Sequence, residues 1–428
     1  MIELNRHLGL FHTTMYGVGL ILGAGIYALI GDAAGQAGNS VWLSFVLAAV
    51  SAVFTGLSYA ELSSMYPKAA AEYSFVKNAF KNNFLAFLVG WLTLFVAVIS
   101  AAAIALGFGG YFTQIFQIPI VLAAVAIIAI LTFVNYFGIR ESSSMNIILT
   151  IIEAAGLGVV IWAGVTMTGV QIDYLEMPHG FSGIFSAFTL VFFAYIGFEN
   201  IVNIAEEVKN PRKVLPRAII LAISITAIVY ILVSVSAVRV LDWQGLDASF
   251  APLADVIKKS LGQQWGFGIL VIALFATTNT VLIMLVSGSR ILYGVSFDRA
   301  LPAIFSTIHQ KRKTPWIAVL IIGVLSAGFV FIGDIGTVAN ISVFAIIMVF
   351  VLVNLSLIWL RYKEPNVERQ FKSPLNIGKF PVLAALGIIT PILGIIQFDP
   401  FVVIMGLAVL ASGALFWYIY NMTKKGKN

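Results

Sequence analysis

Long uncharged apolar stretches follow one another through almost the whole sequence, and they constrain the fold more than any other feature. Of the 428 residues, 60% are hydrophobic and only 10% are charged. A stretch of about 20 apolar residues crosses a bilayer as one helix, and soluble domains do not have this balance of residues. The sequence therefore predicts an all-α integral membrane protein.

Using this length as a guide, we expect 12 transmembrane helices. Their approximate ranges are 11–34, 40–65, 84–115, 119–138, 143–168, 181–206, 215–239, 265–296, 316–333, 336–361, 380–396 and 400–421. Two shorter segments, 72–81 and 251–261, alternate polar and apolar residues at helical spacing. They predict interfacial helices on opposite sides of the membrane.

The distribution of basic residues gives the predicted orientation. All 25 lysines and arginines except Arg239, Lys258 and Lys259 fall on one side of the predicted helices. Short cytoplasmic loops carry an excess of these residues. We therefore expect a multi-pass protein of the cell membrane with both termini in the cytoplasm.

Glycines cluster in the middle of the first predicted helix, within Gly17–Tyr27. Glycine lowers the cost of leaving helical geometry. Non-helical backbone at membrane depth is stable only where it is buried in protein or lines a wet cavity. Two interpretations are open: a broken helix beside a substrate site, or close helix packing through the small residues Gly19 and Gly23.

The sixth predicted helix has a weaker version of the same feature. The segment Phe193–Glu199 places a glycine and a carboxylate in the middle of an apolar stretch. Helices one and six are five apart and would cross in opposite directions. Interrupted helices at matching positions of two halves indicate an inverted-repeat transporter, although no residue-level repeat is visible between the halves.

Five groups of motifs resemble the amino acid–polyamine–organocation (APC) transporter family. They are Gly23–Tyr27; Tyr59–Leu62 with Tyr66–Pro67 and Glu72–Tyr73; Ala194–Glu199 with Glu206–Pro211 and Leu215–Ile219; Ser289–Gly294 with Leu301–Pro302; and Arg361–Pro374. Each motif alone is weak, but their order and spacing along most of the chain are specific. The resemblance implies the leucine-transporter-like fold, with inverted five-helix repeats in 1–168 and 181–361, broken helices one and six, and two trailing helices in 380–421.

The resemblance also implies an amino acid substrate bound between helices one and six. The N–H groups that begin the second half of a broken helix suit a carboxylate, because the helix dipole is positive there. The expected substrate-binding residues are Leu20, Ile21, Gly23, Ala24, Gly25, Ile26, Phe193, Ala194, Ile196 and Gly197. Among them, Ala24, Gly25 and Ile26 would donate to the carboxylate. Carbonyl groups of both breaks would accept from the ammonium group, and by resemblance Phe193 would be an aromatic gate.

Glu153 lies near the centre of the fifth predicted helix, where a charge costs roughly 2.5–3.5 kcal/mol. Some family members carry a lysine at the matching position, and its amine takes the place of a sodium ion. In this chain the residue is a carboxylate. We therefore expect Glu153 to couple transport to an ion, either by binding a proton or by binding Na⁺ together with Gly19, Leu22, Thr277 and Thr278. A protonated, purely structural glutamate is the alternative.

Two further carboxylates have predicted roles near the inner side. Glu199 follows the second interruption, and its interpretation is open between a proton site, a contact for a cationic side chain and a polar cap on the unwound segment. Glu61 ends the second predicted helix close to basic loops. We expect it to form an ion pair, with Arg290 or Arg361, that helps to close the inward face.

Together these features predict a secondary active transporter of amino acids that works by alternating access, most simply by proton-coupled symport. Sodium-coupled symport and exchange of amino acids or polyamines are the alternatives. The sequence has no cysteine, no H-E-x-x-H and no G-x-S-x-G motif, so we expect no enzymatic activity, no cofactor and no structural metal. The expected partners are the amino acid, a proton or sodium ion and the lipid bilayer, but no nucleic acid.

Overall fold

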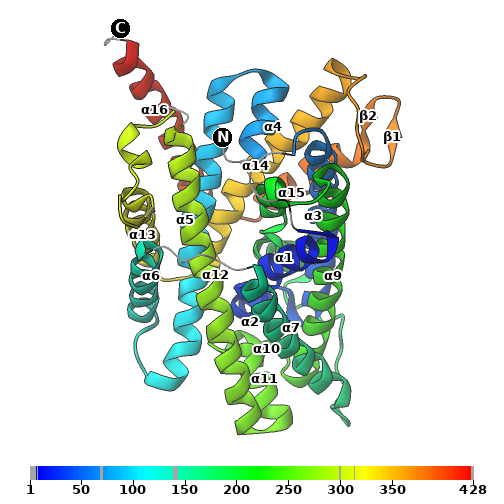
Figure 1. The fold of residues 1–428 in the computed structure, drawn as a ribbon. Helices are drawn as coiled ribbons and strands as arrows, with labels where there is room; N and C mark the ends of the chain where they lie inside the picture. Colours follow the sequence, from blue (N-terminus) through cyan, green and yellow to red (C-terminus); the bar gives the residue numbers. More distant parts are fainter. Residues whose placement is uncertain are drawn as a thin grey trace.

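The computed structural model describes residues 6, 8–67, 71–137, 143–297, 300–312 and 314–425. Of the basic residues on the predicted cytoplasmic side, Lys68, Arg140, Arg299, Lys313 and Lys427 lie outside these ranges. The described chain is almost entirely helical, as predicted, and contains one short β-hairpin. The longest helices run along the long axis of the molecule (Figure 1).

The first half of the chain begins with an interrupted helix and ends near residue 166. Its elements are α1 (Leu10–Leu22), α2 (Ala24–Ala37), η1 (Gly38–Ser40), α3 (Val41–Met65), α4 (Ala71–Phe80), α5 (Asn83–Phe116), α6 (Ile120–Phe137) and α7 (Ser143–Thr166). The predicted interfacial segment 72–81 is α4.

The second half also begins with an interrupted helix. Its elements are α8 (Gly180–Phe192), η2 (Phe193–Tyr195), η3 (Phe198–Glu207), α9 (Pro211–Val240), α10 (Trp243–Asp247), α11 (Pro252–Leu261), α12 (Gln263–Phe297), η4 (Ala303–Ser306), α13 (Trp316–Val330) and α14 (Ile335–Lys363). The hairpin strands β1 (Asn376–Ile377) and β2 (Phe380–Pro381) follow, and then α15 (Val382–Ile395) and α16 (Pro400–Lys425). The second predicted interfacial segment, 251–261, is α11.

The order of helix lengths is similar in the two halves. In each half the interrupted helix is followed by a long helix, and later by a ten-residue helix, α4 or α11. The longest helix comes next, with 34 residues in α5 and 35 in α12. Figure 1 places α4 and α11 at opposite ends of the molecule.

Nine segments of the described chain are long and apolar enough to cross a membrane. The first, Leu10–Met65, has 56 residues and contains α1, α2 and α3, which is more than a single crossing needs. The helices α13 and α15 are apolar but shorter. The prediction of a multi-pass membrane protein is therefore confirmed.

Both predicted helix interruptions are present. Gly23 separates α1 from α2 with φ −42° and ψ −152°, so the chain leaves helical geometry there. At the second interruption, Gly197 has φ +135°, a conformation that favours glycine. A Cβ atom on Gly197 would lie 2.9 Å from the carbonyl oxygen of Leu20. The two breaks therefore lie against each other.

Two local features differ from the prediction. The segment after the second break, η3, is a 3₁₀ helix and not a continuation of an α-helix. The loop after α14 contains the antiparallel β1–β2 hairpin, which the all-α prediction did not include. Its two-residue turn begins with Gly378 at φ +60°, and glycine permits such a tight turn.

A buried ion-pair cluster joins the end of α3 to the end of α14. Glu61 accepts hydrogen bonds of 2.6 Å from both Nε and Nη2 of Arg361, and Arg369 Nε lies 3.1 Å from Glu61 Oε1. The backbone N–H of Ser373 donates to the same carboxylate at 2.8 Å. The predicted partner Arg361 is therefore confirmed, whereas the other candidate, Arg290, lines a cavity elsewhere.

Candidate functional site

A small cavity, here called the central pocket, lies where the two helix breaks meet. It is lined by Leu20, Ile21, Gly23, Ala24, Gly25, Ser100, Ile104, Phe193, Ala194, Ile196, Thr280 and Met284. Eight of the ten predicted substrate-binding residues are in this set. Ile26 and Gly197 are not, because Ile26 is fully buried in α2 and Gly197 packs against Leu20. The volume is about 10 Å³, which is room for about one water molecule.

A larger cavity, here called the vestibule, adjoins the central pocket and shares Leu20 and Met284 with it. Its volume is about 370 Å³. Its walls come from α1, α4, α5, η3 and α12, and include Glu72, Asn203 and Arg290. The central pocket thus continues toward the end of the molecule where α4 lies (Figure 1).

At the opposite end, α10 packs closely on α2. A Cβ atom on Gly31 would lie 2.8 Å from the carbonyl oxygen of Leu246, and one on Gly35 would collide with the carboxylate of Asp247. Helix α10 therefore packs against the C-terminal half of α2.

The first break offers backbone donors at the start of α2. The N–H of Ala24 lies 3.2 Å from Thr280 Oγ1 of α12, and the Thr280 hydroxyl donates to the carbonyl of Ala276 at 2.9 Å. The N–H groups of Gly25 and Ile26 follow, in the first turn, where an α-helix supplies no acceptor of its own. One of the three predicted donors is therefore engaged by Thr280, a residue that the sequence did not single out.

Tyr230 of α9 connects the two breaks. Its fully buried hydroxyl is within hydrogen-bonding distance of the carbonyl oxygens of Ile21 and Ala194, with 3.1 Å to the latter. A hydroxyl carries one hydrogen, so it donates to one of these carbonyls at a time. Two of the predicted acceptors for a substrate ammonium group thus already have a protein neighbour. No motif in the sequence distinguished this tyrosine.

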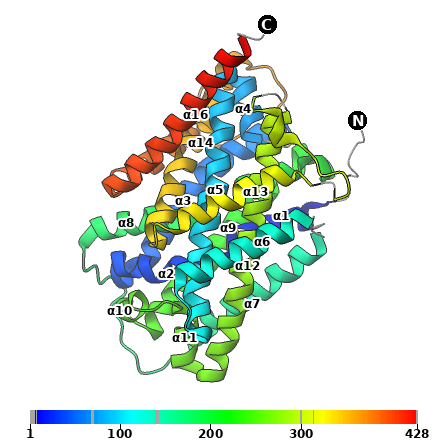
Figure 2. The ribbon, with the colours of Figure 1, turned by 90° about the vertical axis from the view of Figure 1, so that its left-hand side faces the viewer.

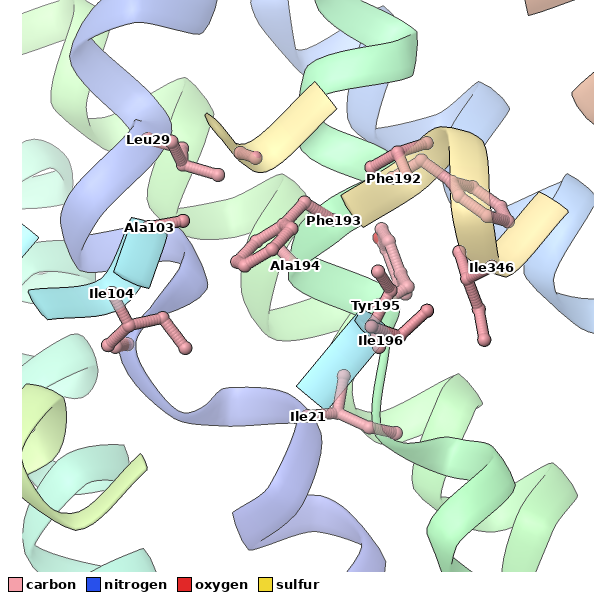
Figure 3. Close-up of a cluster of buried hydrophobic side chains, with 14 of the residues drawn as sticks. Ile21, Leu29, Ala103, Ile104, Phe192, Phe193, Ala194, Tyr195, Ile196 and Ile346 are labelled. Carbon is pink, nitrogen blue, oxygen red and sulfur yellow. The ribbon is translucent and has the colours of Figure 1, made fainter. Parts of the chain in front are cut away.

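Phe193 is buried at the edge of the central pocket, with 4% of its surface exposed. Figure 3 shows its ring pointing from the second break toward Ala103 and Ile104 of α5. Ile104 and Phe193 both line the central pocket. The ring therefore lies where a side chain covering a bound molecule would stand.

Glu153 of α7 is buried, and neither carboxylate oxygen has a hydrogen bond of good geometry among the described residues. Asn279 of α12 faces the carboxyl group. The hydroxyl of Tyr27 donates to the backbone carbonyl of Glu153 at 2.9 Å, which ties α7 to α2. A buried carboxyl group without a cationic partner is costly in the ionised form.

The other residues of the predicted sodium site are not joined to Glu153 by any hydrogen bond in the described chain. Gly19 and Leu22 are buried in the last turns of α1. The hydroxyl of Thr277 donates to the carbonyl of Ala273 in its own helix at 2.8 Å, and Thr278 is half-buried on α12.

Glu199 caps the second break. Its Oε2 accepts a 2.8 Å hydrogen bond from the backbone N–H of Gly197, and its Oε1 accepts one of 3.0 Å from Asn200. It does not line the central pocket. Of the three interpretations given for Glu199, the geometry therefore favours the polar cap on the unwound segment.

Glu72 is a buried carboxyl group in the wall of the vestibule. Nothing in the sequence indicated a chemical role for it. It accepts a 3.2 Å hydrogen bond from the hydroxyl of Tyr59. Burial raises the pKa of Glu72 to about 7, with the hydrogen bond from Tyr59 acting in the opposite direction. The protonation change of this group therefore falls near neutral pH.

Comparisons with known proteins identify the family of the chain. Residues 8–423 match the family model described as amino acid permease. The chain is 32% identical to the branched-chain amino acid permease BcaP of Bacillus subtilis (strain 168), over 98% of this chain and 94% of that protein. It is 29% identical to the methylthioribose transporter of the same organism, over 90% and 87%. It is 31% identical to the vacuolar cationic amino acid transporter 4 of Arabidopsis thaliana, over 85% and 64%.

Proposed function

The chain belongs to the amino acid permease family, whose members are membrane transporters and not enzymes, and on this premise we propose that it carries a neutral amino acid by proton-coupled symport. One observation carries the proposal. Two helix breaks meet at a central pocket that adjoins a vestibule lined in part by α4, while α10 packs on α2 at the opposite end of the molecule. A site accessible from one side only is what alternating access requires.

The element order supports 12 membrane crossings in two inverted repeats and two trailing helices. We count α1–α2, α3, α5, α6, α7, α8–η3, α9, α12, α13, α14, α15 and α16 as the crossings. The ten-residue helices α4 and α11 precede the longest helix of each half and lie at opposite ends (Figure 1). The repeats then fall in 1–168 and 181–361, with the trailing pair in 380–421.

The lining of the central pocket supports a neutral, apolar substrate side chain. Its side chains are aliphatic, aromatic or thioether groups apart from the hydroxyls of Ser100 and Thr280, and none is ionisable. A cationic side chain would need a carboxylate in the pocket, and Glu199 is engaged by Gly197 and Asn200. A relative is described as a branched-chain amino acid permease, which agrees with this choice.

The substrate backbone would be recognised by the helix breaks themselves. The N–H groups of Gly25 and Ile26 start α2 and suit the carboxylate. The carbonyls of Leu20, Phe193 and Ile196 would accept from the ammonium group, because those of Ile21 and Ala194 have Tyr230 as a neighbour.

Coupling is assigned to Glu153. A proton neutralises this buried carboxyl group, which has no cationic partner in the described chain. Sodium bound by Glu153 with Gly19, Leu22, Thr277 and Thr278 is the alternative, and exchange without a coupling ion is another.

The orientation follows from the basic residues. The vestibule is lined in part by α4, and α4 lies at one end of the molecule (Figure 1), which is the predicted cytoplasmic side. The structure is then an inward-facing conformation of a cell-membrane protein with both termini in the cytoplasm.

The test is uptake of labelled leucine into proteoliposomes under an inward proton gradient, an inward sodium gradient, or a load of unlabelled leucine. Accumulation under the proton gradient alone is expected. Accumulation that requires sodium would show that the coupling ion is Na⁺ and would favour the alternative in which Glu153 helps to bind it. Movement only against preloaded substrate would establish an exchanger, and no movement of any neutral amino acid would overturn the substrate assignment.

A further inference from the structure

A third cavity lies on the outer surface between α6 and α13, far from the helix breaks in sequence and lined by different residues. It has a volume of about 450 Å³ and is here called the α6–α13 groove. The two helices pack on each other and lie side by side on the face turned to the viewer in Figure 2. Its walls include Val125, Phe133, Val324 and Ala327, and 62% of Phe133 and 72% of Val324 are exposed.

The groove has the length of one lipid leaflet. Its lining on α6 runs from Val125 to Tyr136, a distance of about 16 Å at the rise of an α-helix. Half of the hydrocarbon core of a bilayer is about 15 Å. At one end of the groove stand Tyr136 and Trp316, the two residue types that gather at the membrane–water interface. This end therefore lies at headgroup level.

A cation is held at this same end. The Arg312 guanidinium lies over the rings of Tyr136 and Phe137, with its carbon 4.2 Å and 3.8 Å from the ring centres. The Thr314 hydroxyl donates to the carbonyl of Tyr136 at 3.0 Å, which fastens the Arg312 loop to α6. Among the described residues no carboxylate forms an ion pair with Arg312.

We propose that the α6–α13 groove is a specific site for one anionic glycerophospholipid, with an acyl chain in the groove and the phosphate at Arg312. The charge, the interfacial aromatic pair and the leaflet-length apolar lining follow one another in the order of headgroup, interface and acyl chain. A guanidinium also suits a phosphate group better than an ammonium does, because its planar donors match the oxygens. The lipid belongs to the leaflet on the side of the 309–314 loop.

The proposal predicts a difference between two neighbouring cations. Lys311 is exposed in the same loop and does not line the groove, so it serves as a charge-matched control. In Arg312→Gln, phosphatidylglycerol retained by the purified protein, measured by native mass spectrometry in mild detergent, should fall about fivefold, since one basic residue near the membrane surface contributes about 1 kcal/mol. Lys311→Gln should retain nearly the wild-type amount.

A second variant tests the groove independently of charge. Ala129 is exposed and lines the groove, so Ala129→Trp fills it without entering the protein core. This variant should lose bound phosphatidylglycerol as Arg312→Gln does, while both remain monodisperse on gel filtration. Equal lipid retention by Arg312→Gln and Lys311→Gln, or unchanged retention in Ala129→Trp, would overturn the site. Equal retention of phosphatidylcholine and phosphatidylglycerol by the wild type would also overturn it.

Discussion

Replacement of Gly25 by alanine probes the contact on which the central pocket is built. A Cβ atom at this position would lie 2.7 Å from Cα and 2.9 Å from Cβ of Ala194 in the second break. The best separation of two carbon atoms is about 3.5–4.0 Å, so the two breaks must move apart by roughly 1 Å. The neighbouring atom at 2.7 Å is backbone, and therefore no side-chain rotation relieves the clash.

The magnitude follows from this overlap. An extra methyl group in a packed region costs typically 1–3 kcal/mol, and here the cost applies to conformations in which the two breaks meet. If substrate binding keeps the Gly25–Ala194 contact and the free protein can relax it, the substrate affinity falls by roughly 5- to 150-fold, since about 1.4 kcal/mol is a factor of ten. Alanine is otherwise favoured over glycine in a helix, so the variant should fold.

The assay is binding of labelled leucine to the purified protein, with Gly158→Ala as the control. Gly158 is also a helical glycine, in α7, and a Cβ atom there meets nothing within 4 Å. Gly158→Ala should bind like the wild type. If Gly25→Ala is monodisperse on gel filtration and binds leucine within twofold of the wild type, substrate binding does not depend on the contact between the two breaks.

Three further outcomes are expected. Glu153→Gln should abolish leucine accumulation driven by a proton gradient while counterflow continues, because an amide mimics the protonated carboxyl group; pH-driven accumulation in this variant would contradict the coupling role. Glu61→Gln should lower the unfolding free energy by roughly 3–5 kcal/mol, because Arg361 would lose its buried carboxylate, and an unchanged melting temperature would refute this. For Glu72, burial raises the pKa from 4.5 to about 7, so the folded state holds its proton more tightly than the unfolded state does. Its contribution to stability is therefore greatest below about pH 4.5 and falls by ~3 kcal/mol up to about pH 7. Glu72→Gln should make the melting temperature less dependent on pH in this range. A pH dependence identical to that of the wild type would exclude Glu72 as the cause.

The interruptions of helices one and six illustrate what local sequence predicts well. Gly23 and Gly197 stand in apolar stretches, where a continuous helix is otherwise the only way to satisfy the backbone. A glycine cluster at such a place already indicates a break, and the backbone angles confirm it. The ion pair of Glu61 with Arg361 was also predictable, because a carboxylate and a basic residue at adjacent helix ends on one side of the membrane need partners.

The contacts of Tyr230 and Thr280 show where local sequence is insufficient. Tyr230 meets Ile21 across 209 positions, and Thr280 meets Ala24 across 256. Nothing near either residue in the chain indicates these partners. The same holds for the α6–α13 groove, whose walls are separated by about 190 positions and look like ordinary lipid-facing helices in the sequence.

The sequence by itself determined that this is a membrane protein, the approximate limits of its helices and the places where two of them break. Hydropathy reflects contact with the bilayer, and glycine acts on the local backbone, so both signals can be read from a single segment. The tertiary structure alone decided which backbone groups of the breaks are engaged, how small the central pocket is and where α10 packs on α2. Those properties depend on side chains brought together from distant helices, such as Tyr230, Thr280 and Leu246. Packing of this kind is set by the whole fold, and no single segment carries its signal.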